Sequence, residues 1–509
     1  MTGASASRPT GSSARRRRGR RRACSASSPP RRPPPHPPPK RRRPHPPTSP
    51  RKPLSTPGSR PVWHPEITKK EQEMSATKRW LAGSVAAIAA VGLAGCSAGD
   101  GGGGTADEPT VVEFWGWNQG QDLMVDAFNE ANETVQLTYT QFPSQADLLT
   151  GLSNAVTAGT DVPCLVQAPG SPVSLLSKGL IQPITEQFAG NEDAFIETAV
   201  TSQSANDEIL GVPFSGGPGF AMINKAVYDA NGLEAPTTWD ELIETGKTLK
   251  DQGVSVLNFA GEDPSTLVSF SNQAGATWFE IDGDSWVVDI DSPETQKAAD
   301  VLQQFIDNDL ITHETFADIP AMSQTYDAGK MVTIPLTTWN LAAWQERLST
   351  SLGSWQTIDL PQFADADEFV VPGSFGGYSV PEGCESVDAA VDAAVFLATD
   401  PTTVGIAASP SEGAGNYPAI PDAGEYVDGL LPPTLLGDTV GETPAVIERA
   451  ANAARVQWID SPSATYFDEL VSQWAKAVNK EITLREAVTH MQDYVVSDLE
   501  AQGIDVTER

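Results

Sequence analysis

Apolar residues beyond residue 109 recur with two different spacings. An apolar run at 110–117 is typical of a buried strand, and apolar residues then recur at helical spacing over 123–131. The same succession returns in a strand at 135–139, a helix over 148–156 and a strand at 162–167. Because strands alternate with helices, the pattern predicts a parallel sheet in an α/β lobe.

Ligands of such sheets collect outside the carboxyl ends of the strands. Those ends place Trp117 to Gln119, the loop after Tyr139, and Gln167 to Gly170 at one edge of the predicted sheet. We therefore expect a binding site at this edge.

Two glycine-rich segments, 211–219 and 371–378, interrupt the regular pattern. Small residues absorb changes in backbone direction, so both segments predict crossings between lobes. Further helices are predicted to begin at Thr238, which has capping-box spacing to Glu241, and at Ser292-Pro293.

These crossings divide the chain into lobes. Helical patterns also cover 387–398 and most of the tail from 447 to 502. The expected boundaries are 110–215 for the first lobe, 216–372 for the second, 373–425 for a return to the first, and 426–509 for C-terminal helices that belong mainly to the second.

The first 73 residues differ in composition from the rest of the chain. They hold 19 Lys or Arg against three Glu, with long proline runs, and such a composition predicts disorder. One interpretation is a basic arm for nucleic acid or anionic lipid. The other is that translation starts at Met74 and that 1–73 derives from a mis-called start codon.

Residues 74–95 have the pattern of a secretory signal, since a short basic segment precedes sixteen uncharged, mostly apolar residues. The ending Leu93-Ala94-Gly95-Cys96 resembles the bacterial lipobox, which predicts lipid attachment at Cys96. Residues 96–109 then form a glycine-rich, flexible tether. A buried helix that ends in an incidental cysteine is the alternative.

The balance of charge changes sign at Cys96. The whole chain has 34 basic and 66 acidic residues; the part up to Cys96 holds 21 and three of them, which leaves 13 basic and 63 acidic and a formal charge of −50. A surface that negative repels nucleic acid and anionic lipid. We expect no nucleic-acid partner, and membrane contact through the lipid anchor only.

Few residues remain for redox or metal chemistry beyond Cys96. Cys164 and Cys384 can be joined in an oxidising exterior, with two buried thiols as the alternative. His313 and His490 are too few for a histidine-rich metal site or a histidine triad. We expect no cofactor and no metal.

Short motifs follow one another over nearly all of the chain beyond Cys96. They are Phe114-Trp115-Gly116-Trp117, Ala127-Phe128-Asn129, 158–163, 179–184, Gly211-Val212-Pro213, Ile223-Asn224-Lys225, 236–242, 326–331 with Trp339, and Gly376-Gly377-Tyr378. In order and spacing they resemble the extracellular solute-binding proteins of bacterial carbohydrate ABC importers, the group that includes maltose-binding protein. Pro163-Cys164 departs from this pattern, because family members commonly have Pro-Asp there.

The resemblance implies a two-lobed periplasmic-binding-protein-like fold of type II. Two or three strand crossovers would form its hinge, and a carbohydrate would bind in the cleft between the lobes. Closure of the cleft would signal occupancy to the permease subunits in the membrane. The resemblance also implies a monomer that is not an enzyme.

A sugar site needs flat aromatic surfaces for C–H faces, beside amides and carboxylates for hydroxyls. Trp115, Trp117, Asn118 and Gln119 supply both at the end of the first strand. Since side chains alternate along a strand, one tryptophan is expected to face the cleft, and we favour Trp117. Packing of both beneath the loop is the alternative.

The other candidates come from later segments. Trp339-Asn340 follow an apolar run, at a place where family members commonly stack an aromatic ring on the sugar. Core packing is the alternative for Trp339 and for Trp278, and hinge geometry is the alternative for Gly376. The predicted ligand-binding set is Trp115, Trp117, Asn118, Gln119, Gln167, Phe214, Asn272, Trp278, Trp339, Asn340, Gly376 and Tyr378.

These patterns favour a lipid-anchored, non-enzymatic receptor that delivers a mono- or oligosaccharide to an ABC importer. One alternative is a secreted glycoside hydrolase, because counting does not exclude a catalytic pair of carboxylates among 63 acidic residues. Another keeps the fold and binds a polyamine, a peptide or a metal complex.

Overall fold

The computed structural model describes residues 109–168, 170–282, 285–456 and 465–508. They lie in a compact unit that spans Gly99–Arg509. Cys96 and the predicted signal sequence lie outside the described residues.

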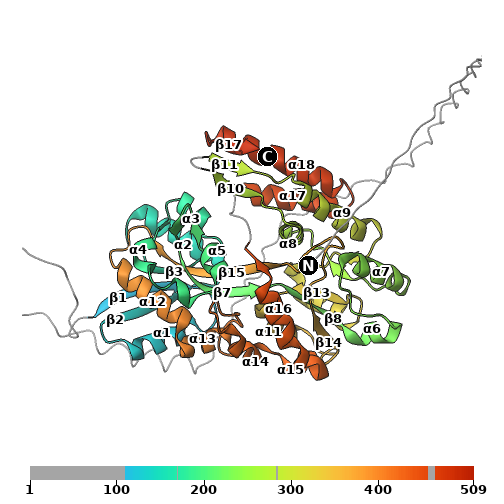
Figure 1. Cartoon of the computed structure of the whole chain (residues 1–509), viewed down its shortest axis with the longest axis horizontal. Coiled ribbons are helices and arrows are strands. Elements are labelled where there is room, and N and C mark those ends of the chain that lie inside the picture. The colour runs from blue at the N-terminus through green and yellow to red at the C-terminus, as the bar shows by residue number, and fades with distance from the viewer. Residues whose placement is uncertain (1–108, 169, 283–284, 457–464, 509) are drawn as a thin grey trace, which may run out of the picture. The chain divides into compact units, whose positions relative to one another are not determined.

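Lobe 1 is built on a seven-stranded sheet in which β1 runs parallel to its neighbours β2 and β3 (Figure 1). The order is β16-β15-β3-β1-β2, and β4 and β7 also pair with β15. The strands are β1 (Thr110–Gly116), β2 (Val135–Gln141), β3 (Leu165–Ala168), β4 (Ile181–Gln182), β7 (Val212–Pro218), β15 (Val371–Pro381) and β16 (Ala454–Arg455).

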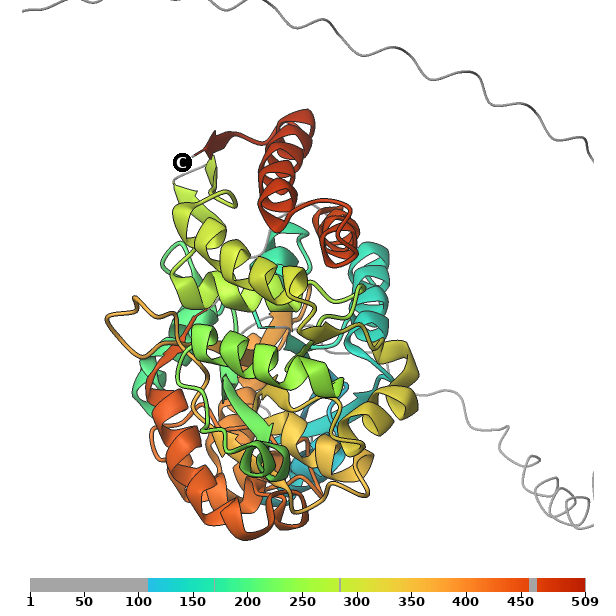
Figure 2. The same ribbon diagram turned by 90° about the vertical axis from the view of Figure 1, so that its right-hand side faces the viewer.

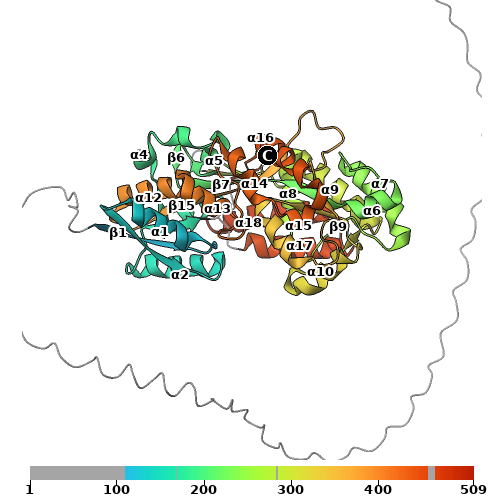
Figure 3. The same ribbon diagram turned by 90° about the horizontal axis from the view of Figure 1, so that it is seen from below.

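Helices cover both sides of this sheet (Figures 1 and 3). A short hairpin of β5 (Ser204–Ala205) and β6 (Glu208–Ile209) lies apart from it. The helices of lobe 1 are α1 (Gln121–Ala131), α2 (Gln145–Ala158), α3 (Val173–Ser177), α4 (Thr185–Phe188), η1 (Glu192–Ala194), α5 (Glu197–Ser202), α12 (Val387–Thr399) and α13 (Pro401–Ala408).

The predicted succession of strands and helices at the start of lobe 1 is confirmed. Helix α2 is capped by Gly159, whose N–H donates to the Ala155 and Val156 carbonyls and whose left-handed φ of 64° turns the chain out of the helix. Strand β3 begins at Leu165 instead of the predicted residue 162. The difference has a local cause, because Pro163 has no N–H to donate to a sheet.

Lobe 2 is built on the antiparallel sheet β13-β8-β14. Its strands are β8 (Phe220–Asn224), β13 (Thr333–Leu336) and β14 (Trp355–Ile358). A smaller sheet pairs β9 (Leu257–Asn258) with β12 (Ile311–Thr312). Another consists of β10 (Phe279–Asp282), β11 (Ser285–Val288) and β17 (Val506–Glu508).

Helices α7 and α9 of lobe 2 begin with well-formed caps. Thr238 and Glu241 form the predicted capping box at the start of α7, and the Ser292 side chain accepts from Thr295 N–H at the start of α9. The helices between the two crossings are α6 (Lys225–Asn231), α7 (Trp239–Leu249), η2 (Lys250–Gln252), α8 (Ser265–Ala274), α9 (Pro293–Asp307), η3 (Phe316–Asp318), α10 (Ile319–Asp327) and α11 (Thr338–Arg347).

The C-terminal part of the chain is mainly helical. Helix α18 packs against α9 and α17, beside the sheet of β10, β11 and β17 (Figure 2). The C-terminal helices are η4 (Ala423–Tyr426), α14 (Val427–Leu430), α15 (Pro433–Leu436), η5 (Gly437–Glu442), α16 (Thr443–Asn452), α17 (Tyr466–Val478) and α18 (Leu484–Ala501).

The two glycine-rich segments are strands: the chain leaves lobe 1 after the end of β7 at Pro218 and returns to it at the start of β15 at Val371. β7 and β15 pair antiparallel from Gly373 opposite Pro218 to Tyr378 opposite Val212, with a register shift after Gly376. A Cβ atom on Gly217 would lie 2.8 Å from the Ser374 carbonyl oxygen. Glycine is therefore required there, because a side chain would push the two strands apart.

Helices α12 and α13 are packed into lobe 1. The rings of Phe128 and Phe396 meet edge to face at 5.2 Å, which joins α1 to α12. Among the described residues no single helix is long and apolar enough to cross a membrane, and α12 with α13 meets that test only as a pair bent by 63°.

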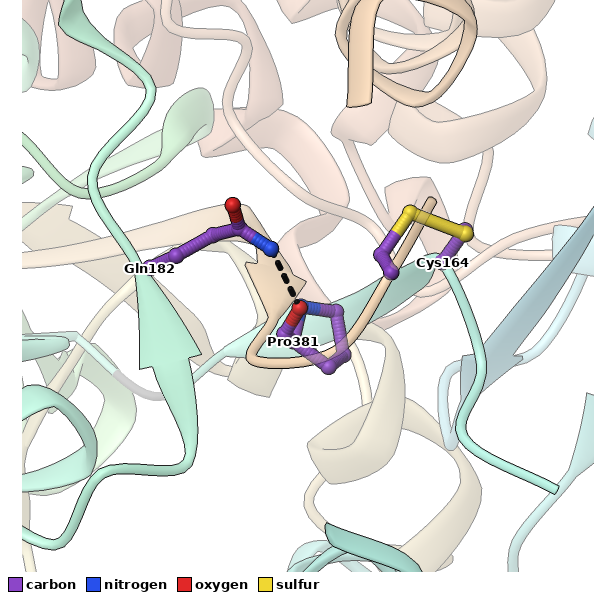
Figure 4. Close-up of a disulfide and its surroundings, with 4 residues drawn as sticks. Cys164, Gln182 and Pro381 are labelled. Carbon is purple, nitrogen blue, oxygen red and sulfur yellow. Dashed lines mark hydrogen bonds between the residues drawn. A yellow bond between two sulfur atoms is a disulfide. The ribbon is translucent and has the colours of Figure 1, made fainter. Parts of the chain in front are cut away.

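A disulfide joins Cys164, just before β3, to Cys384, just after β15 (Figure 4). The Cα atoms are 4.9 Å apart, although 220 residues separate the two cysteines in sequence. Next to it, Gln182 Nε2 donates to the Pro381 carbonyl at 2.9 Å. The end of β15 is thus held to the sheet covalently and by pairing with β4.

We expect the double variant Cys164→Ala with Cys384→Ala to unfold more easily than the wild type. Cross-linking a loop of 220 residues removes entropy from the unfolded chain, and losing such a bond costs about 2–5 kcal/mol. Urea unfolding of the variant and of the oxidised and reduced wild type measures this. Equal midpoints for the three samples would contradict the expectation.

Candidate functional site

A cavity of about 420 Å³ opens in lobe 2, within the size range of small-ligand sites. It is bordered by β8, by β9 and the residues after it, by α8, and by the chain from β13 through α11. The crossing residues Gly219 and Pro372 to Ser374 close its side toward lobe 1. The cavity therefore lies where the two lobes are joined.

Aromatic rings form much of the cavity wall. Trp339 and Phe316 are 51% and 45% exposed, whereas Phe270, Tyr326 and Trp344 are buried. Tyr326 and Trp344 meet edge to face at 4.7 Å. Two accessible rings thus stand at the opening, and a rigid aromatic base lies beneath them.

The start of α11 fixes the position of Trp339. Asn340 Oδ1 accepts from the Thr337 N–H at 3.1 Å and from the Thr337 hydroxyl at 3.3 Å. Because Asn340 is used to cap the helix, the neighbouring Trp339 has a well-defined backbone while its ring stays accessible.

Two further amides of the wall are committed to the protein itself. Asn258 bonds Thr312 and both backbone groups of Glu314. Gln273 accepts from Trp239 Nε1 at 2.9 Å and donates to the Pro361 and Val370 carbonyls. These side chains hold the wall together, and because their polar atoms already have partners, ligand recognition is left mainly to other groups.

Among the described residues, the charged ones that line the cavity are Asp263 and Arg347. Asp263 Oδ1 accepts from the Ser265 N–H at 3.0 Å, just before α8. The Arg347 guanidinium lies over the Trp344 ring, 5.4 Å from its centre. The described wall thus carries one carboxyl group and one guanidinium group among its aromatic rings.

Ionisation of the groups around α10 follows from burial and hydrogen bonding. Burial raises the pKa of Tyr326, and the charge of Glu314 raises it further, so the phenol is neutral near pH 7. Burial by itself raises the pKa of Asp327, but hydrogen bonds from Ser351 and Ser349 lower it well below its usual range. Asp327 is therefore an anion that ties the end of α10 to the turn after α11.

In lobe 1, the predicted residues after β1 form a hydrogen-bonded turn. Gln167 Oε1 accepts from the Trp117 and Asn118 N–H groups at 3.0 and 3.3 Å, and from Gln121 Nε2 at 3.2 Å. Gln119 is exposed, and its side chain donates to the Ser411 carbonyl at 3.2 Å. Gln167 thus shapes the turn that presents its neighbours.

Trp115 has partners within lobe 1. Its Nε1 donates to Glu113 Oε1 at 2.7 Å, and its ring lies 5.0 Å from that of Phe142. Gly151 of α2 also lies close to the Trp115 ring. The indole is therefore held between β1 and α2, away from the cavity of lobe 2.

Phe214, Tyr378 and Gly376 form a packed cluster between β7 and β15. The rings of Phe214 and Tyr378 stack at 4.7 Å, and Tyr378 is 1% exposed. A Cβ on Gly376 would lie 3.0 Å from the Phe214 ring. The three residues lie together in lobe 1 but do not border the cavity of lobe 2.

Asn272 and Trp278 are buried in lobe 2. Trp278 is fully buried, and its Nε1 donates to the Thr295 hydroxyl at 2.8 Å. Asn272 Nδ2 donates to the Val456 carbonyl at 3.2 Å. Of the predicted ligand-binding set, Trp339 and Asn340 are the members that border the cavity.

A loop of lobe 1 connects the two groups of candidates. Ser411 accepts from Gln119, and a Cβ on Gly415 would lie 3.7 Å from the Trp339 Cα. Gly120, at the start of α1, packs against the Glu412 backbone with a φ of 81°. The segment 409–416 therefore touches both the turn after β1 and the start of α11.

Sequence reasoning did not identify Phe316, Asp263 or Arg347. Phe316 stands alone in a polar stretch, and a solitary aromatic residue gives no periodic signal. Arg347 could have been singled out from the sequence, because only 13 basic residues follow Cys96 and each of them is therefore notable. No sequence signal distinguishes Asp263 from the other acidic residues, because 63 of them follow Cys96.

Residues 123–428 match the profile of a family described as bacterial extracellular solute-binding protein. A curated relative, a probable sugar-binding periplasmic protein of Rhizobium meliloti (strain 1021), is 27% identical over 184 residues, 35% of this chain and 43% of the relative. The chain thus spans less than half the length of this relative in the match.

Solved structures of two-lobed binding proteins share the fold. The galacto-N-biose-/lacto-N-biose I-binding protein of Bifidobacterium longum, in complex with lacto-N-biose, has a TM-score of 0.68 at 20% identity, over 78% of this chain and 99% of that one. An ABC transporter associated binding protein of B. animalis subsp. lactis Bl-04, in complex with β-1,6-galactobiose, has a TM-score of 0.64 at 17% identity, over 79% and 100%. These likenesses establish the two-lobed α/β fold.

We expect Asp327→Asn to destabilise the protein by about 1–2 kcal/mol at pH 7. Asparagine keeps the shape of the side chain but loses the charge of the carboxylate that accepts these hydrogen bonds. Solvent near Asp327 reduces what that charge contributes to the free energy of unfolding. Because the folded-state pKa is lowered, the stabilisation is fully present above the unfolded pKa of about 4 and is lost as the pH falls below it.

Urea unfolding at pH 7 and pH 3 measures this difference. The exposed Asp193→Asn is the control and should match the wild type at both pH values. A gap between wild type and Asp327→Asn that is as large at pH 3 as at pH 7 would exclude the electrostatic cause.

Proposed function

Because the chain belongs to the bacterial extracellular solute-binding proteins, we propose that it captures a carbohydrate outside the cell and delivers it to the permease subunits of an ABC importer. The observation that supports a sugar most directly is the cavity of lobe 2, with Trp339 and Phe316 accessible at its opening. Aromatic faces pack on the C–H faces of sugars, and nearby polar groups bind their hydroxyls. The relatives named as sugar-binding support the same class of ligand.

Capture uses both lobes in this proposal. The sugar stacks at the start of α11, and the turn at Trp117, Asn118 and Gln119 approaches it from lobe 1. A ligand shifts the protein toward the closed form only if it contacts the two lobes better when they are shut. The segment 409–416 touches both sides already, so it is positioned to follow such a movement.

The protein binds its ligand without turnover in this proposal. A glycoside hydrolase needs two carboxyl groups on either side of the scissile bond. Among the described residues that line the cavity, Asp263 supplies one carboxylate and Arg347 supplies a cation. This pairing suits binding of a ligand better than glycosidic hydrolysis.

The protein acts as a monomer held at the outer face of the membrane through lipid on Cys96. The lipobox-like ending Leu93-Ala94-Gly95-Cys96 and the glycine-rich tether support this anchor. The tether would let the two lobes move freely above the membrane.

We expect Trp339→Ala to weaken sugar binding by about 30-fold. The loss corresponds to about 2 kcal/mol, the contribution of an aromatic surface that packs on the ligand. Calorimetry with a panel of neutral and acidic mono- and oligosaccharides, including lacto-N-biose and β-1,6-galactobiose, measures affinity and detects any product release. Phe467→Ala, which removes an aromatic ring that is 55% exposed on α17, is the matched control.

Two outcomes would count against the proposed function. If no sugar in the panel binds the wild type, the ligand class is wrong. If sugars bind and Trp339→Ala leaves the affinity unchanged, the cavity of lobe 2 is not the site.

We expect Cys96→Ala to release the protein from the membrane fraction or to block removal of the signal sequence. The thiol is the acceptor for the lipid, and without it a tether alone gives no membrane affinity. Fractionation of cells expressing the wild type, Cys96→Ala and the control Ser97→Ala measures this. A membrane-bound, processed Cys96→Ala protein would refute the anchor.

A further inference from the structure

Arg347 differs from the other arginines that the structure describes. Arg449 pairs with Asp359 at 2.8 Å, Arg455 donates to the Gly275 carbonyl at 2.9 Å, and Arg485 pairs with Asp300. Arg347 has neither a hydrogen bond nor an ion pair within the described ranges. Its contact is with a ring, since the guanidinium lies 5.4 Å from the centre of Trp344.

The charge of the chain makes this lack of a carboxylate partner informative. Acidic residues outnumber basic ones by 63 to 13 beyond Cys96. Seven other basic side chains in the described part of the chain form ion pairs with acids, as Lys225 does with Asp229 and Lys480 with Asp309. Lys178, Lys330 and Lys476 form none there, but unlike Arg347 they do not border the cavity. Arg347 is half-buried at the cavity wall and its guanidinium has no hydrogen-bonding partner among the described residues, so its five donors are available to a ligand.

The cavity favours an anion at this position. The amides of Asn258 and Gln273 are used within the protein, and Asn340 uses its Oδ1 to cap α11. Asp263, the other charged residue among those described in the wall, forms no ion pair with Arg347 and accepts a backbone N–H instead. A guanidinium held over an indole presents a planar fork that matches an oxyanion, and apolar surroundings strengthen the interaction.

Helix α11 sets the distance between this cation and the accessible tryptophan. Trp339 and Arg347 are eight positions apart on the same helix, which corresponds to about 12 Å along its axis. Both residues border the cavity. A sugar ring on Trp339 would therefore have its acidic group toward the far end of the helix.

We propose that Arg347 binds an oxyanion of the ligand and that the captured solute is an acidic sugar, a glycan that bears a carboxylate or a phosphate or sulfate ester. This inference rests on the proposed carbohydrate-binding function and narrows it. An anion must approach a protein of strongly negative charge, but at 0.15 M salt charges more than about 8 Å away are largely screened. At shorter range, Arg347 is the cation that the described part of the wall presents to an oxyanion.

Calorimetry with matched pairs of sugars tests the proposal. The pairs are galactose with galacturonic acid, galactobiose with digalacturonic acid, and glucose with glucose 6-phosphate, all at 0.15 M salt. We expect the acidic member of at least one pair to bind 10-fold tighter or more than its neutral parent. The uronate and phosphate arms distinguish the two sources of the oxyanion.

Variants of Arg347 locate the effect. Arg347→Gln should remove the preference for the acidic sugar and leave the affinity for the neutral one within about 3-fold. Arg347→Lys keeps the charge but loses the planar fork, so it should keep only part of the preference. Arg485→Gln removes the same charge from a surface ion pair on α18 and should leave the preference unchanged.

The outcomes separate this inference from the proposed function. Neutral sugars that bind as tightly as their acidic partners would overturn the acidic-sugar assignment while the carbohydrate function stands. If Arg347→Gln weakens the affinity for the neutral and the acidic sugar of a pair equally, Arg347 binds hydroxyls and the acidic-sugar assignment is wrong. Absence of binding by every sugar would reject both proposals, and thermal melting of each variant verifies that it is folded.

Discussion

The antiparallel pairing of β7 with β15 is the constraint on which the rest of the structure depends. β7 leads from lobe 1 to lobe 2, and β15 brings the chain back, so one pairing fixes both passages at once. The close approach of the two backbones requires glycine at positions such as Gly217. The cavity lies beside this ribbon because Gly219 and Pro372 to Ser374 form part of its wall. Changes in the ribbon would therefore displace the site along with the lobes.

Local signals predicted the elements of the fold well. Thr238 with Glu241 and Ser292-Pro293 mark helix starts by hydrogen bonds within a few residues, so sequence is enough to find them. The glycine-rich segments were expected as crossings, but their pairing into one ribbon depends on contacts between residues more than 150 positions apart. Such long-range pairing leaves no short-range pattern in the chain.

The site was harder to predict because one residue type serves different purposes. Trp278 and Trp339 both stand near polar residues in the sequence, yet the first is fully buried and the second is half exposed. Amides show the same ambiguity, since Gln167 and Gln273 hold backbone groups in place. Tertiary packing decides which side chains are used internally and which remain free for a ligand. Arg347 stands out only after the partners of the other arginines are known.

The disulfide closes the chain between Cys164 and Cys384 into a covalent ring. That ring contains β8, β13 and β14, so the whole central sheet of lobe 2 is an insertion between two cross-linked points of lobe 1. A protease that nicks an exposed loop of lobe 2 once, anywhere within the ring, leaves both fragments attached to each other. An extracellular protein with this topology can be cut there and still remain one molecule until its disulfide is reduced.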